Sequence, residues 1–326
     1  MSSLESKFAS ALPVSSSLPD EAGRIVGELL GSQPRAVKFI RQGLMTFKVR
    51  VTTQQGERVI VRFYPPRRGS VVNQEPDLLA RCRAAGVPVP QVIGDSRTGP
   101  TSELAYVAYY MIEGATLSSR LPTCTPSQIS DLARDLAGQL SNFDAIEFRG
   151  AGEIVNSVIA QDHSWESFVD NSMRIGLEAV RRHALLDSNS IDQLTRIVDR
   201  GIEGRAQGMH SLVWGDINFG NILVDADYRI AGLIDFESCL SGDPLATLGY
   251  CLAAQGHDAF VAQLLRTWPE QLGRHEVETV LLYALLRALR LARYAHLPLP
   301  TGYARDPLTE IFPGITLALD ELSRRP

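Results

Sequence analysis

The sequence lacks the features of disulfide-bonded, zinc-binding, membrane-spanning and secreted proteins. It contains 4 cysteines in 326 residues, none in a Cys-x-x-Cys pair, and its 6 histidines show no His-x-x-x-His spacing. We therefore expect reduced thiols and no zinc site. The most apolar run, at 280–286, is followed at once by Arg287 and is too short to span a bilayer. Glu5 and the lack of a continuous apolar segment near Met1 argue against a secretory signal, which predicts a cytoplasmic protein.

Long basic runs are also missing, and the formal net charge is −5 at pH 7. This charge argues against nucleic acid as the main partner. Hydrophobic residues make up 44% of the chain and the mean hydropathy is −0.03, which is typical of a globular protein large enough for two lobes. We expect no membrane partner, and a monomer or weak dimer.

The most informative segment combines a predicted hairpin with three oxygen-bearing side chains. Two apolar runs between 222 and 234 are separated by a polar turn, which predicts a β-hairpin. A turn centred on 226–227 would place Asp235 opposite Asn218, inside the loop that ends at Asn221. We therefore expect the side chains at both ends of this segment to converge.

These side chains suit phosphoryl transfer. Mg²⁺ takes one or two protein oxygens and fills its remaining positions with water and nucleotide phosphate, so Asn221 and Asp235 are the predicted metal ligands. Asp216, five residues before Asn221, is the predicted catalytic residue, which orients an acceptor hydroxyl and takes its proton. The alternative is that Asp and Asn next to glycines simply form turns. Turn chemistry does not require the hairpin arrangement.

The same segment resembles the C-lobe signature of the aminoglycoside phosphotransferase and choline kinase superfamily, in Gly215-Asp216-x-x-x-x-Asn221, Ile234-Asp235-Phe236 and Gly242-Asp243-Pro244. The resemblance implies an α+β, bilobal, protein-kinase-like fold, with a small antiparallel β-sheet N-lobe and a mainly helical C-lobe. It also implies Mg²⁺ as cofactor and ATP or GTP as phosphoryl donor.

The chain departs from this signature at two positions. Trp214 stands where the family usually has histidine, and Thr247 stands where an aspartate is common. An indole N–H can donate one hydrogen bond but cannot accept one, so the first departure bears on how the catalytic loop is braced. Asp243 has two readings of equal weight, as a helix cap or as a ligand contact.

The first half of the chain predicts a small sheet with one helix. Residues 1–35 are interpreted as an N-terminal extension with a helix from Pro19 or Asp20, outside the main fold. Strands, a helix and further strands are then expected, in the order 37–40, 47–52, 59–64, 73–85 (helix), 91–94 and 104–112. This order resembles a kinase N-lobe, taken as 36–112.

The resemblance implies nucleotide contacts from several N-lobe residues. In the loop between the first two strands, Gly43 permits close backbone approach to phosphate and the Thr46 hydroxyl can contact phosphate oxygens. An ordinary hairpin turn is the alternative for this loop. The hinge is expected at 109–114, where Tyr110 and Ile112 are assigned by position to the adenine-binding backbone.

Arg62 interrupts the apolar strand at 59–64, where the family places a basic residue over the α- and β-phosphates. The planar guanidinium group of arginine can donate paired hydrogen bonds to phosphate oxygens. Its expected partner is Glu75, with Asp77 as the competing candidate. The alternative is that Arg62 lies on the solvent face of an alternating strand.

The C-lobe is taken as 113–326 and is expected to be helical apart from the functional hairpin. Apolar residues at helical spacing predict helices at 127–142, 164–186, 189–206 and 275–294.

Three function classes fit this sequence. A protein kinase is disfavoured because seven residues between Asp235 and Asp243 are too few for an activation segment. A nucleotide-binding pseudokinase would explain the departures at Trp214 and Arg62. We favour a small-molecule O-phosphotransferase whose hydroxyl acceptor is an aminoglycoside or other antibiotic, with a choline-, sugar- or amino-acid-like alcohol as the alternative. Net charge and nearby acids favour a cationic acceptor, the acids being Glu166, Asp170, Glu178, Glu237, Glu276 and Glu278.

Overall fold

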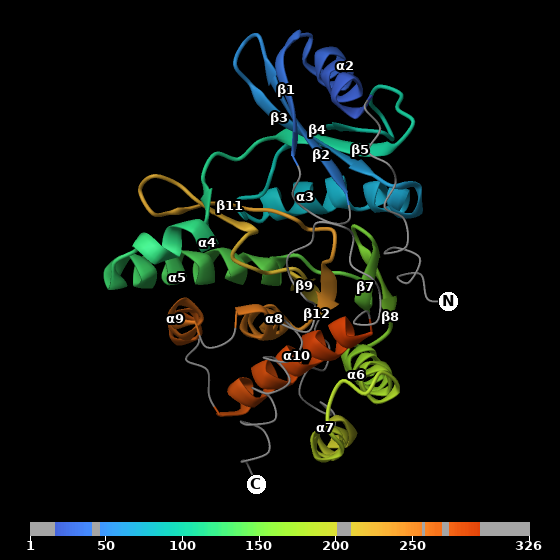
Figure 1. The fold of residues 1–326 in the computed structure, drawn as a ribbon, viewed down its shortest axis with the longest axis vertical. Helices are drawn as coiled ribbons and strands as arrows, with labels where there is room; N and C mark the ends of the chain where they lie inside the picture. Colours follow the sequence, from blue (N-terminus) through green and yellow to red (C-terminus); the bar gives the residue numbers. More distant parts are fainter. Residues whose placement is uncertain (1–16, 41–45, 201–209, 256–257, 269–273, 294–326) are drawn as a thin grey trace. The chain divides into compact units, whose positions relative to one another are not determined.

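The computed structural model describes residues 17–40, 46–200, 210–255, 258–268 and 274–293. The chain forms two compact units (Figure 1). The first holds the described residues of Met1–Ala84 together with Val89–Glu113, and the second holds Ala85–Pro88 and those of Gly114–His296.

The first unit is built on an antiparallel sheet with the strand order β1-β2-β3-β5-β4. The strands are close to those predicted, and a short 3-10 helix, η1, precedes the expected helix α3. Their bounds are β1 Pro34–Ile40, β2 Phe47–Thr53, β3 Arg58–Tyr64, η1 Pro66–Asn73, α3 Glu75–Ala84, β4 Val92–Asp95 and β5 Ala105–Tyr110. Central strand β3 pairs with β2 and β5, and its residues after Arg58 are buried on both faces of the sheet.

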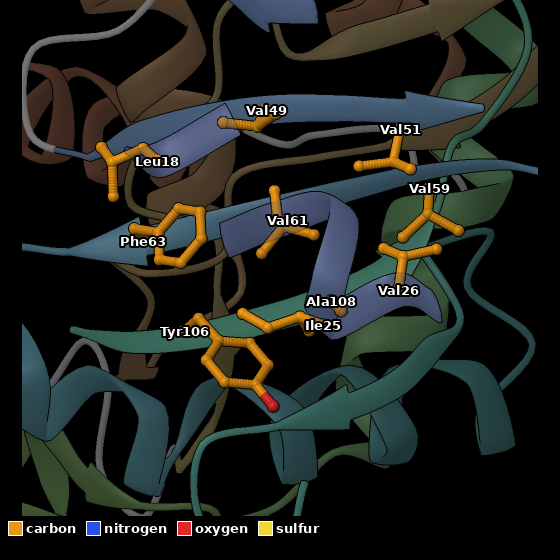
Figure 2. Packing of buried hydrophobic residues seen from close by; sticks show 11 residues of the cluster. Leu18, Ile25, Val26, Val49, Val51, Val59, Val61, Phe63, Tyr106 and Ala108 are labelled. Carbon is orange, nitrogen blue, oxygen red and sulfur yellow. The ribbon is translucent and has the colours of Figure 1, made fainter. Parts of the chain in front are cut away.

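The N-terminal helix α2 (Leu18–Leu30) belongs to the core of this unit, as Figure 2 shows. Its apolar residues recur at helical spacing and pack on one face of the sheet. The cluster contains Leu18, Ala22, Ile25 and Val26 of α2 and Val49, Val51, Val59, Val61, Phe63, Tyr106 and Ala108 of the strands. The interpretation of residues 1–35 as an extension outside the main fold therefore needs correction for this helix, because its apolar face covers the sheet.

Within the described residues, the second unit contains the four predicted helices and three further ones. The four predicted are α5 (Pro126–Ser141), α6 (Trp165–Arg182), α7 (Ser188–Arg200) and α10 (Arg274–Ala292). The others are α4 (Leu117–Arg120), α8 (Leu245–Gln255) and α9 (Ala259–Thr267), with short 3-10 turns η2 (Leu121–Thr123) and η3 (Asn142–Ala145). Among the described helices, none is both long and apolar enough to cross a bilayer.

The expectation of a single hairpin in this unit was wrong. A three-stranded sheet has the order β11-β10-β6, and a four-stranded sheet has the order β8-β7-β12-β9. Their strands are β6 Ala115–Thr116, β7 Ala151–Asn156, β8 Ile159–Asp162, β9 Ser211–Val213, β10 Ile222–Val224, β11 Ile230–Leu233 and β12 Leu240–Gly242. Strands β6, β9 and β12 have 2 or 3 residues each, too few to show alternation in the sequence.

Candidate active site

The hairpin β10–β11 forms as predicted, but its register differs. Ile234 N–H donates to Asn221 O at 3.0 Å, which sets Ile234 opposite Asn221. Asp235 is therefore next to the residue paired with Asn221, and it does not lie opposite Asn218 as predicted.

The turn of the hairpin explains the difference. Asp225 Oδ1 accepts hydrogen bonds of 2.9 Å from the N–H groups of both Asp227 and Arg229, and Tyr228 has φ 58°. An aspartate that binds its own following backbone stabilises a wider turn than the two-residue turn assumed at 226–227. The turn adds one residue, and a β-bulge between Leu223 and Val224 adds a second, so the strand partners shift.

The loop between β9 and β10 is closed by side-chain amides. Asn221 Nδ2 donates to the carbonyl oxygen of Asp216 at 2.9 Å and to its carboxylate Oδ2 at 3.1 Å. Asn218 Nδ2 donates to the same carbonyl at 3.1 Å, and Asn218 Oδ1 accepts from Gly220 N–H at 2.9 Å. The structure thus brings two of the predicted residues, Asp216 and Asn221, into contact. Asn218 is a structural member of the loop that its sequence position alone did not identify.

The backbone is restricted at two positions near this loop, Gly215 before Asp216 and Asp235 after β11. A Cβ at Gly215 would clash with the carbonyl oxygen of Ser238, so the position requires glycine. Asp235 has φ 70°, a left-handed conformation that is uncommon for residues other than glycine. Such conformations persist where surrounding contacts hold them, and they are frequent at functional sites.

Trp214 supplies contacts that hold Asp235. Its indole Nε1 donates to the carbonyl oxygen of Asp235 at 3.2 Å, and its ring stacks on Phe236 with 5.4 Å between ring centroids. Its backbone N–H donates to Thr247 Oγ1 at 3.1 Å. The side chain is fully buried. Trp214 therefore braces the Asp216 loop against the segment that carries Asp235, using only the donor that an indole has.

The Asp216 carboxylate is partly open to solvent, with 40% of its side chain exposed. Its Oδ1 accepts from Arg287 Nη2 at 3.4 Å, while Asn221 holds Oδ2. Packing of surrounding groups raises the pKa of Asp216, the Arg287 guanidinium opposes this rise, and the charge of Asp235 adds to it. Sequence reasoning did not assign Arg287 to the site, although it is the first cation after an apolar helical run.

Asp243 is a structural residue here. Its Oδ1 accepts from Leu245 N–H at 2.9 Å at the start of α8, and its Oδ2 accepts from Tyr283 O–H at 2.7 Å. The side chain is buried, and burial raises its pKa. Of the two readings left open, the geometry favours the helix cap.

In the first unit, Arg62 contacts Glu75 and Thr46. The side chain is 2% exposed, so the solvent-face alternative was wrong. Arg62 Nη1 pairs with Glu75 Oε1 at 3.1 Å, and Nε donates to Thr46 Oγ1 at 3.0 Å. Tyr64 O–H also donates to Glu75.

The competing candidate, Asp77, pairs with Arg97 instead. Glu75 is therefore the partner of Arg62. The Thr46 hydroxyl, expected at phosphate oxygens, accepts from arginine in this structure.

The other residues predicted to contact the nucleotide are Gly43, Tyr110 and Ile112. Gly43 is outside the described residues. Tyr110 ends β5, and its N–H donates to Gln91 O at 3.0 Å, so that donor is engaged within the sheet. Ile112 is half-buried in the irregular segment that follows β5.

One of the acids expected to attract a cation, Glu178, lines a groove between α6 and α7 with Arg174, Arg181 and Asp199. The charged side chain that contacts Asp216 is the cation Arg287. This observation weakens the argument for a cationic acceptor.

The residues at the hairpin suit Mg²⁺. The described residues hold no cluster of three or more His, Cys, Asp or Glu side chains that would form an all-protein metal site. Mg²⁺ needs no such cluster, because it keeps waters and phosphate oxygens as ligands. Asn221 donates its amide nitrogen to Asp216, which directs Oδ1 to the opposite side. One amide oxygen and the Asp235 carboxylate then form a suitable two-ligand set.

Comparisons with known proteins show the family and the fold. A profile described as "Phosphotransferase enzyme family" matches residues 36–294. A search of curated proteins found no match.

Many solved structures are similar. A thermostable mutant of aminoglycoside phosphotransferase APH(4)-Ia with ADP and hygromycin B has 16% identity and a TM-score of 0.69, covering 94% of this chain and 99% of its own. Aminoglycoside 2'-phosphotransferase-IIIa with GDP has 18% identity and a TM-score of 0.68, and the match covers 94% of this chain and 99% of its own. A protein assigned as fructosamine-3-kinase from Haemophilus somnus 129PT has 16% identity and a TM-score of 0.63, and the match covers 91% of this chain and 96% of its own. At these identities the likeness establishes the protein-kinase-like α+β fold.

Proposed function

This chain belongs to the phosphotransferase enzyme family, and we propose that it transfers the γ-phosphoryl group of ATP to a hydroxyl of a small molecule of the aminoglycoside or another antibiotic class. The observation that carries the site assignment is the hydrogen bond between Asn221 Nδ2 and Asp216 Oδ2, next to the segment that carries Asp235. GTP is an alternative donor, since one similar structure holds GDP.

In this proposal Asp216 is the catalytic residue. Its carboxylate orients the acceptor hydroxyl and takes its proton while the acceptor oxygen forms a bond to the γ-phosphorus. The bond from the γ-phosphorus to the bridging oxygen breaks, and ADP leaves. Asn221 holds one carboxylate oxygen, so the other can face the acceptor.

Asn221 Oδ1 and Asp235 would hold Mg²⁺, which when bound neutralises phosphate charge. Arg62, fixed by Glu75, is assigned to the nucleotide phosphates, together with Gly43 and Thr46. Tyr110 and Ile112 remain assigned by position to the adenine-binding backbone.

A transfer assay with labelled nucleotide tests this proposal. The protein is incubated with Mg²⁺ and γ-labelled ATP or GTP against hygromycin B, other aminoglycosides, choline, sugars and amino-acid alcohols, and labelled product is measured. Transfer to an aminoglycoside supports the proposed acceptor class. Transfer only to a metabolic alcohol overturns that class while leaving phosphotransfer intact. Binding of AMP-PNP without transfer or hydrolysis would favour a pseudokinase.

A further inference from the structure

Arg287 of α10 lies beside the loop that carries the proposed base. It is 7% exposed, and its guanidinium lies over the ring of Tyr250 at 5.6 Å from the ring centroid. Nη1 donates to the carbonyl oxygen of Gly215, and Nη2 donates to Asp216 Oδ1 at 3.4 Å. Both acceptors belong to the Gly215-Asp216 dipeptide, 71 residues away in sequence.

The location of this cation requires an explanation, because α10 otherwise presents an apolar face. Its neighbours in the helix are buried, namely Leu282, Tyr283, Leu285, Leu286, Ala288 and Leu289. Burying a cation is unfavourable unless hydrogen bonds or an opposite charge compensate. The partners of Arg287 that compensate are the carbonyl of Gly215, the carboxylate of Asp216 and the π face of Tyr250.

The two oxygens of Asp216 are held by donors from different elements. Arg287 of α10 approaches Oδ1, and Asn221 at the start of β10 donates to Oδ2 at 3.1 Å. A carboxylate held at both oxygens cannot rotate freely about its terminal torsion. A proton acceptor needs this restraint, because a displacement of 1 Å in a catalytic group can lower the rate by about 10²-fold.

We propose that Arg287 is a positioning residue for the phosphoryl-transfer reaction, fixing the Gly215-Asp216 peptide and the plane of the Asp216 carboxylate so that one oxygen meets the acceptor hydroxyl. This inference rests on the proposed function of Asp216. It adds a residue that lies outside the sequence signature and acts through the base without contacting the substrate.

The test uses Mg²⁺-ATP hydrolysis, in which water is the acceptor, so no acceptor molecule has to be known. Arg287→Met should lower the hydrolysis rate by about 10- to 100-fold, while the Kd for AMP-PNP changes by less than about 2-fold. Arg287→Lys keeps the charge and should recover part of the rate. The matched control is Arg290→Met, one turn further along α10, because Arg290 pairs with Glu153 at 3.5 Å. The control should hydrolyse ATP at close to the wild-type rate.

A double-mutant cycle separates positioning from a merely structural role. In an Asp216→Asn background, Arg287→Lys and Arg287→Met should cause little further loss, because Arg287 acts through the carboxylate. Equal losses in both backgrounds, or equal losses in Arg287→Met and Arg290→Met, would overturn the positioning role. If Arg287→Met does not fold, the cycle is completed with Arg287→Lys. Failure of the proposed function looks different, since the wild-type protein would then not hydrolyse ATP, whether or not it binds AMP-PNP.

Discussion

Trp214 and Thr247, the two positions at which this chain departs from the family signature, are hydrogen-bonded to each other. The backbone N–H of Trp214 donates to Thr247 Oγ1 at 3.1 Å, and both residues are buried. The threonine hydroxyl thus satisfies a buried donor at the entrance to the Asp216 loop. The two departures therefore form one contact and do not argue for a damaged site.

Removing the Thr247 hydroxyl should destabilise the protein. Thr247→Val leaves the buried Trp214 N–H without its partner, which should cost about 1–3 kcal/mol in the free energy of unfolding. Thr247→Ser keeps the acceptor and serves as the control, with a smaller loss from the missing methyl group. Urea unfolding of the three proteins measures the difference. Equal stability of Thr247→Val and the wild type would show that the hydrogen bond contributes nothing.

Replacing the proposed metal ligands should weaken nucleotide binding through the metal. In Asp235→Ala and Asn221→Ala, the affinity for Mg²⁺-AMP-PNP and the turnover should fall together, because both residues would hold the Mg²⁺ that neutralises phosphate charge. Calorimetric titrations with and without Mg²⁺ give the metal-dependent part. Asp227→Asn, in the exposed hairpin turn, is the control. An unchanged Mg²⁺ dependence in Asp235→Ala would remove this residue from the metal site.

Lysine at position 62 should preserve only part of the nucleotide affinity that Arg62 provides. A lysine ammonium can keep the charge opposite Glu75, but it cannot also reproduce the Nε contact with Thr46. We expect the Kd of AMP-PNP to rise by less than about 10-fold in Arg62→Lys and by more in Arg62→Gln, since hydrogen bonds to charged groups contribute about 1.5–3 kcal/mol. If all three proteins bind equally, Arg62 is purely structural.

The buried thiols should be unreactive in the folded protein. Burial raises the pKa of Cys82 and of Cys251 to about 12, so both stay protonated at neutral pH, and the thiolate is the reactive form. Cys124 is only half-buried and should react first. A thiol-reactive disulfide reagent at about pH 8 should modify all 4 cysteines only after unfolding in urea. Rapid modification of Cys82 in the native state would contradict this packing.

Local patterns in the sequence predicted the elements and the first contacts of the site. Strand alternation gave the first-unit strands, and the spacing of Asp216 and Asn221 anticipated that their side chains meet. The hairpin register could not be predicted, because it depends on how the Asp225 side chain folds the turn. The Asp225 turn and a β-bulge between Leu223 and Val224 together moved Asp235 away from Asn218.

Contacts between distant parts of the chain were beyond the sequence argument. The role of α2 in the sheet core depends on which apolar face the tertiary structure covers. Arg287 meets Asp216 only because α10 packs against the loop, and its sequence context shows no more than an interruption in an apolar run. Tertiary packing determines both the position of α2 and the contact between Arg287 and Asp216. The local sequence alone predicts neither.

The most direct test compares wild type with Asp216→Asn. Asparagine keeps the size of the side chain but removes the proton acceptor, and Asp227→Asn provides a control in the exposed hairpin turn. With Mg²⁺-ATP and an acceptor found by the labelled-phosphate screen, we predict that turnover falls by about 10²–10⁴-fold in Asp216→Asn while the Kd of AMP-PNP is unchanged. Turnover of Asp216→Asn near the wild-type rate would contradict the assignment of Asp216 as the base for phosphoryl transfer.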